Sequence, residues 1–134
     1  LETLKPLYFA EELLRQLVDS KIILGIVSNK AGDLLRAECD YLGWNDYFIN
    51  IIGANDSARD KPAADPLFLC LEDTGVTAGL NTWYVGDAPT DIECAINAGV
   101  TGVLIKNSVI TPDYVEFPPH FHFQNLNKMA KILV

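Results

Sequence analysis

The sequence predicts an α/β fold in which a parallel sheet is wound with helices on both sides, giving three layers. Short β-rich apolar runs alternate along the 134 residues with segments whose apolar residues recur at helical spacing. The runs show no alternation of polar and apolar residues, which is typical of strands buried on both faces. Alternating elements of these two kinds indicate βαβ units and therefore a doubly wound parallel sheet.

The first half of the chain is predicted to hold two helices and two strands. A helix is expected over residues 8–19, because apolar side chains follow Pro6 at helical spacing. Residues 22–28 form an apolar run that predicts a buried parallel strand. A second helix should end at Gly43, since glycine commonly terminates helices, and a second strand is expected over residues 47–52.

The second half continues the alternation and ends in an irregular, proline-containing tail. The expected elements are a polar loop over 53–61, a helix over 65–73, a strand over 82–85, a helix ending near Gly99, a strand over 101–105 and a last helix over 125–134. No internal repeat or interdomain linker interrupts them. Residues 1–134 are therefore expected to belong to one domain.

Composition excludes several classes of function. The net charge is −8, from 18 acidic and 10 basic residues, which disfavours nucleic acid or an anionic membrane surface as a partner. No apolar run approaches the roughly 18 residues of a membrane span, and no signal-peptide pattern opens the sequence. Three widely spaced cysteines are expected to be buried, reduced thiols. We expect a cytoplasmic protein.

The most informative segment joins the strand over 82–85 to the helix that follows it. Asp87 lies in a Gly-Asp turn after the strand, and Asp91 lies on the first turn of the helix. Two carboxylates so placed face the crevice at the carboxyl end of a parallel sheet, and they suit Mg²⁺, which also retains water and phosphate ligands. The alternative is an ordinary turn, with Asp91 favouring the positive end of the helix.

Two further loops should meet the first one at the same edge of the sheet. Ser28 and Asn29 end a predicted strand, where a hydroxyl, an amide and free backbone N–H groups can bind phosphate, although simple capping of the next helix remains an alternative. Lys61 precedes Pro62 and could offset phosphate charge, unless it is a solvated surface lysine. Together the loops predict a site for metal-assisted phosphate chemistry.

These segments resemble motifs two, three and four of the haloacid dehalogenase superfamily, specifically its phosphoglycolate phosphatase branch. The matching segments are IILGIVSNK at 22–30, Lys61-Pro62 and WYVGDAPTDIECAINAG at 83–99, and the resemblance extends over residues 7–133. It implies a Rossmann-like core and a magnesium phosphatase for a small, phosphoglycolate-like phosphate monoester.

The resemblance also implies a role for each motif residue. Ser28 would bind the phosphoryl group with Asn29 beside it, and Lys61 would steady the nucleophile and the phosphate charge. Asp87 would be a direct Mg²⁺ ligand. Asp91 would be a second ligand or an anchor behind the first.

Motif one of the superfamily is not found in this sequence. The nucleophile of these enzymes comes from an Asp-x-Asp pair after the first strand, and no Asp-x-Asp occurs in the 134 residues. By the resemblance, the first strand and the cap domain would lie upstream of Leu1, and that strand would occupy the middle of the sheet. We therefore expect a core without its central strand, an inactive isolated chain, and completion of the sheet by the N-terminal segment or another copy.

Three hypotheses for function follow. The chain is the C-terminal part of a Mg²⁺-dependent phosphatase that forms an aspartyl-phosphate, or a non-catalytic module of the same fold that binds a partner or a phosphorylated ligand. The third is an unrelated doubly wound domain. Receiver domains need an early acidic cluster and dinucleotide binders need a glycine-rich first turn, and the sequence contains neither.

Overall fold

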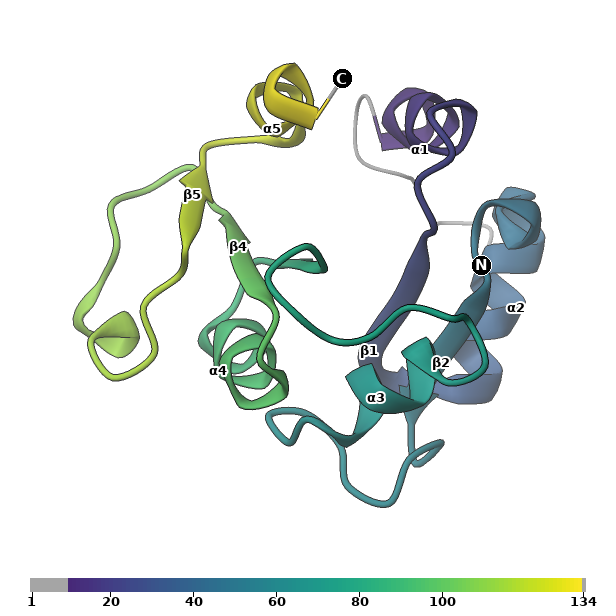
Figure 1. Cartoon of the computed structure of the whole chain (residues 1–134), viewed down its shortest axis with the longest axis horizontal. Helices are drawn as coiled ribbons and strands as arrows, with labels where there is room; N and C mark the ends of the chain where they lie inside the picture. Colours follow the sequence, from purple (N-terminus) through teal and green to yellow (C-terminus); the bar gives the residue numbers. More distant parts are fainter. Residues whose placement is uncertain (1–9, 134) are drawn as a thin grey trace.

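The computed structural model describes residues 10–133, and its strands form two parallel sheets (Figure 1). One sheet pairs β1 with β2, and the other has the order β3-β4-β5. The strands are β1 (Gly25–Ala31), β2 (Asn50–Ala54), β3 (Trp83–Gly86), β4 (Thr101–Ile105) and β5 (Phe121–Phe123). The expected α/β class is confirmed.

Helices cover both faces of these sheets. They are α1 (Ala10–Asp19), α2 (Gly32–Leu42), α3 (Asp65–Leu71), α4 (Pro89–Ala98) and α5 (Leu126–Leu133), with short 3-10 helices η1 (Asn45–Tyr47) and η2 (Pro112–Tyr114). A Cβ atom on Gly25 would collide with Cys70 of α3, whereas one on Gly53 would collide with Gly32 of α2. Gly25 pairs with Asn50, three residues before Gly53, so α2 and α3 lie on opposite faces.

The two sheets are joined mainly through helices. Leu13 and Leu17 of α1 form one buried cluster with Val103 of β4 and Met129 of α5. On the other side, Leu67 of α3 packs in a cluster with Cys94 of α4. The β1–β2 half is thus tied to the β3–β5 half by apolar contacts rather than by a continuous ladder of backbone hydrogen bonds.

A slot separates β1 from β3, and in residues 10–133 no strand occupies it. In β4, which has neighbours on both edges, Val103 and Leu104 are 0% exposed, whereas no residue of β1 or β3 is buried. Cavities of about 330 and 450 Å³ border the slot, lined on opposite sides by residues such as Leu24 and Trp83. The expectation of a core without its central strand is confirmed.

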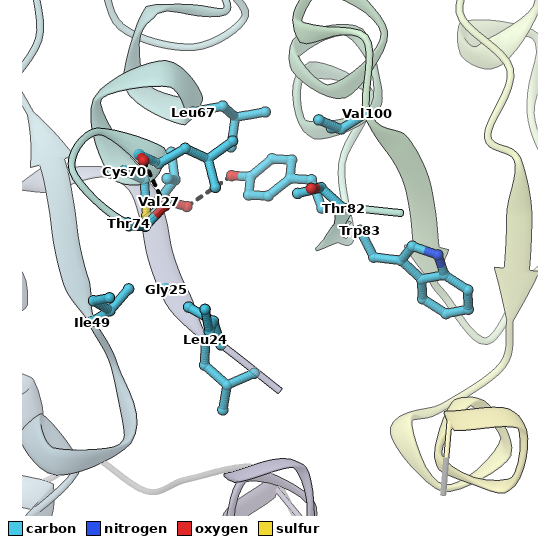
Figure 2. Close-up of a pocket in the computed structure, with 13 residues that line it drawn as sticks. Leu24, Gly25, Val27, Ile49, Leu67, Cys70, Thr74, Thr82, Trp83 and Val100 are labelled. Carbon is cyan, nitrogen blue, oxygen red and sulfur yellow. Dashed lines mark hydrogen bonds between the residues drawn. The ribbon is translucent and has the colours of Figure 1, made fainter. Parts of the chain in front are cut away.

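Figure 2 shows the pocket between the two half-sheets, with Val27 of β1 and Trp83 of β3 on opposite sides. The Tyr84 hydroxyl crosses this space and donates a hydrogen bond of 2.7 Å to the Val27 carbonyl. Burial, followed by the nearby charge of Asp91, raises the pKa of Tyr84, so the phenol remains a donor. Tyr84 therefore links β3 to β1 by a hydrogen bond across the slot.

Removal of that hydroxyl should weaken the link between the two half-sheets. We expect Tyr84→Phe to lower the free energy of unfolding by about 1 kcal/mol, because the Val27 carbonyl loses its donor. Urea unfolding measures the change. Tyr41→Phe, at a tyrosine that is 52% exposed, is the matched control. An equal effect of the two substitutions would show that this hydrogen bond contributes nothing to the free energy of unfolding.

Several strand and helix boundaries predicted from the sequence are wrong. The strand predicted over 22–28 is β1, which begins at Gly25, extends to Ala31 and is not buried, because its slot-facing edge has no neighbouring strand. The run 47–52 begins inside η1, and only its end belongs to β2. Residues 8, 9 and 134 of the predicted terminal helices lie outside the described residues.

The remaining expectations are closer to the structure. The helix over 65–73 ends earlier, at Leu71, whereas the strand over 101–105 coincides with β4. The irregular tail holds η2 and β5, the latter parallel to β4. Within residues 10–133, no helix has the length and apolar character needed to cross a membrane.

Candidate phosphate and metal site

The predicted site residues come from three separate segments of the fold. Ser28 and Asn29 lie inside β1 rather than after it, since the strand continues to Ala31. Lys61 lies in the loop between β2 and α3. Asp87 and Asp91 lie where β3 passes into α4. A hydrogen bond from Asn29 to the Lys61 carbonyl and an ion pair between Lys61 and Asp91 show that the fold brings the three segments together.

Lys61 and Asp91 form a buried ion pair at the centre of this site. The Lys61 ammonium contacts Asp91 Oδ1, and the two side chains are only 10% and 8% exposed. Lys61 Nζ also lies 5.6 Å from the centroid of the Tyr84 ring, a cation–π distance. Solvent screens such a pair weakly, so the two charges hold each other firmly in place.

The other oxygen of Asp91 fixes the turn that carries Asp87. Asp91 Oδ2 accepts hydrogen bonds from the backbone N–H groups of Asp87 and Ala88, at 3.0 and 3.1 Å. The carboxylate lies so close to Gly86 that a Cβ atom there would collide with it. A glycine is therefore required before Asp87, and the Gly-Asp turn is explained by its contact with Asp91.

Of the two carboxylates, Asp91 has partners in the protein, whereas Asp87 has none among the described residues. Its side chain is exposed, and it accepts no hydrogen bond from any residue between 10 and 133. Exposed carboxylate oxygens are suitable ligands for Mg²⁺, which completes its shell with water and phosphate. No group of three or more His, Cys, Asp or Glu side chains suited to a metal ion occurs among the described residues. The donors fit Mg²⁺ in kind, but they form only part of a coordination shell.

Asn29 is hydrogen-bonded to the Lys61 loop, whereas the Ser28 side chain bonds within its own segment. Asn29 Nδ2 donates to the Lys61 carbonyl at 3.4 Å. The Ser28 hydroxyl oxygen instead accepts a hydrogen bond of 3.1 Å from the Lys30 N–H, within the same segment. The structure thus connects Asn29 to Lys61, Lys61 to Asp91, and Asp91 to Asp87. Their roles with a ligand remain predictions.

Two residues that were not predicted as site residues also help to shape the site. Tyr84 lies beside the Lys61 ammonium, and Asn97 Nδ2 donates to the Pro62 carbonyl at 3.0 Å, which ties the lysine loop to α4. Tyr84 had the pattern of an ordinary strand residue, and Asn97 that of a polar helix residue. No local signal marks either, because each acts on a loop distant in sequence.

The chain matches the family model described as haloacid dehalogenase-like hydrolase over residues 2–105. It is 36% identical over 93 residues to the phosphoglycolate phosphatase of Pectobacterium atrosepticum. That match covers 69% of this chain and 39% of the relative. The matched segment thus spans well under half the length of this curated relative.

Solved structures share the fold. A haloacid dehalogenase-superfamily hydrolase from Ehrlichia chaffeensis matches with a TM-score of 0.82 and 28% identity, over 94% of this chain and 56% of the other. The hydrolase YfnB from Bacillus subtilis, solved bound to magnesium, matches with a TM-score of 0.78 and 19% identity, over 94% of this chain and 54% of the other. The latter likeness concerns the fold alone.

Proposed function

The chain belongs to the haloacid dehalogenase-like hydrolase family, and we propose that residues 1–134 form the C-terminal part of the catalytic core of a Mg²⁺-dependent phosphatase. The observation that carries this proposal is the connected set of Asn29, Lys61, Asp91 and Asp87. A phosphate site needs donors and a cation, and a metal site needs carboxylate oxygens. The free cysteines, buried at positions 39, 70 and 94, support a cytoplasmic location.

In this proposal each residue has a separate task. Ser28 and Asn29 bind the phosphoryl oxygens, and the Lys61 ammonium offsets their charge. Asp87 is the direct Mg²⁺ ligand, while Asp91 holds both the Asp87 turn and Lys61 in position. Bound Mg²⁺ supplies Lewis-acid stabilisation of the phosphoryl oxygens. The substrate class is a small phosphate monoester, and the relative named phosphoglycolate phosphatase supports a phosphoglycolate-like molecule.

The nucleophile must come from outside these residues. We propose that an extended strand, ending in the aspartate that becomes phosphorylated, occupies the slot between β1 and β3. The unpaired slot-facing edges of these strands and the largely apolar cavities between them support a parallel strand as the occupant. The strand would come from the N-terminal part of the parent enzyme or, alternatively, from another copy of the chain.

The proposal is tested by phosphatase assay of the purified 134-residue chain, alone and co-expressed with an N-terminal segment from a relative that carries the Asp-x-Asp pair. We expect no turnover of p-nitrophenyl phosphate or phosphoglycolate by the chain alone. The reconstituted pair should show Mg²⁺-dependent turnover, because the segment supplies both the nucleophile and the central strand.

Lys61→Met in the reconstituted pair should abolish that turnover, since the phosphate charge loses its partner. Glu38→Gln removes a partner of the exposed Lys30 ammonium and serves as a control outside the site. Turnover by the chain alone would contradict the need for an added nucleophile. A reconstituted pair that is folded but inactive would favour the non-catalytic module.

A further inference from the structure

Tyr114 is a buried residue of η2 with no assigned role. Its side chain is 2% exposed, and its hydroxyl is one of only two buried polar side-chain atoms, among residues 10–133, without a hydrogen-bond partner. Burying a hydroxyl without a partner costs free energy, and native structures contain few such groups. An unpartnered phenol in a folded core therefore calls for an explanation.

The ring of Tyr114 packs against α4 and β4, the elements next to the turn that carries Asp87. It shares a buried cluster with Ile92 and Leu104. Ile92 follows Asp91 on α4, and Leu104 pairs in register with Gly86, the residue before Asp87. The two residues that contact the ring therefore belong to α4 and β4. These are the elements that also hold the turn carrying Asp87.

The charges around the ring agree with this placement. The Lys106 ammonium, at the carboxyl end of β4, lies 6.0 Å from the centroid of the Tyr114 ring. Burial, and after it the negative charges of Asp113, Asp87 and Asp91, raise the pKa of Tyr114. The phenol therefore keeps its proton at neutral pH, and it is a hydrogen-bond donor near carboxylates.

Donor and acceptor in this region complement each other. Tyr114 has a buried donor without an acceptor, and the Asp87 carboxylate accepts no hydrogen bond from residues 10–133. We propose that Tyr114 is a positioning residue of the metal site, whose hydroxyl donates to the Asp87 carboxylate when Mg²⁺ binds to that group. The inference rests on the proposed metal site, and it adds a residue outside the four family motifs.

The physical reason is preorganisation of a single ligand. A carboxylate bound to a cation by one oxygen keeps lone pairs for a second partner, and a hydrogen bond from a phenol restricts its orientation. Residues that hydrogen-bond to metal ligands typically alter metal affinity by about 10–100-fold when they are removed. Tyr114 would act through Asp87 and would not touch the substrate.

The test is an Mg²⁺ titration of the 134-residue chain within the reconstituted pair, followed by the NMR shifts of its Asp87 and Ala88 amides. We expect Tyr114→Phe to bind Mg²⁺ roughly tenfold more weakly than the wild-type chain. Its stability to urea without Mg²⁺ should be unchanged or increased, because the variant keeps the ring and removes an unsatisfied hydroxyl. Tyr41→Phe, on the exposed part of α2, should bind Mg²⁺ as the wild type does.

A second readout does not depend on the folding of that variant. The ring-carbon NMR signal of Tyr114 in the wild-type chain should shift as Mg²⁺ saturates, and it should stay unchanged in Asp87→Asn. Equal Mg²⁺ affinity of the wild type and Tyr114→Phe, or a Tyr114 signal indifferent to Mg²⁺ that does bind, would overturn the role of Tyr114 alone. Absence of any Mg²⁺ response at the Asp87 amide would overturn the proposed metal site as well.

Discussion

Replacing Asp91 by alanine is expected to lower the free energy of unfolding by about 3–5 kcal/mol, the largest effect of any single site residue. The substitution leaves the Lys61 ammonium, only 10% exposed, without its counter-ion. It also removes the acceptor of the Asp87 and Ala88 N–H groups, so the turn at the start of α4 loses its anchor. Urea unfolding followed by circular dichroism measures the loss.

Two comparisons separate this effect from a general loss of charge. Asp33→Ala removes a carboxylate that pairs with Arg36 at 3.2 Å but is fully exposed, and it should leave stability unchanged. In the Asp91→Ala background, Lys61→Met should restore part of the stability, because no unpaired charge is then buried. Similar effects of Asp91→Ala and Asp33→Ala, or no recovery in the double variant, would contradict the buried pair.

Gly53→Ala is expected to destabilise the chain by about 1–3 kcal/mol or more, because β2 and α2 touch through their backbones at this position. A Cβ atom on Gly53 would lie 2.6 Å from both the Gly32 nitrogen and the Lys30 carbonyl oxygen. Backbone atoms cannot turn aside as a side chain can, so the helix must move away from the sheet. Thermal unfolding should show a clear decrease in Tm.

Gly79→Ala is the matched control for that substitution. A Cβ atom there would meet nothing nearer than the Thr77 carbonyl oxygen at 4.0 Å. The stability of Gly79→Ala should therefore be unchanged or slightly higher, since alanine lowers the conformational entropy of the unfolded chain. A decrease in Tm as large as that of Gly53→Ala would show that the loss comes from glycine replacement in general, and not from the contact between β2 and α2.

Sequence patterns predict this structure best where the pattern is local. The strand 101–105 coincides with β4, since Val103, Leu104 and Ile105 form an apolar run shortly after Gly99, which ends the preceding helix. The prediction was wrong at the end of β1, where the apolar run stops at residue 28 but, after an irregularity that follows Val27, Ala31 pairs again with Ala54 of β2. Backbone pairing with a neighbour set that end, and hydrophobicity does not report pairing.

In the candidate site, too, the residues marked by local patterns were predicted, and those that act through distant contacts were not. Lys61, Asp87 and Asp91 were singled out because Lys-Pro and Gly-Asp turns after strands are visible in a single sequence. Tyr84, Asn97 and Tyr114 were not, since each contributes through contacts with distant segments. A tyrosine in a strand or in an irregular tail has many structural uses, and only its neighbours distinguish them.

The sequence by itself determined the family, the alternation of strands and helices, and the order of the motif residues, because these depend on short segments and local backbone geometry. It also indicated that the central strand would be lacking. Only the tertiary structure decided that β1 and β3 stay apart, that Tyr84 spans the slot, and that Asp91 binds Lys61 across 30 positions of the chain. Such contacts require packed helices on both faces, since the entropy of closing a long loop is offset only by burial in the folded core.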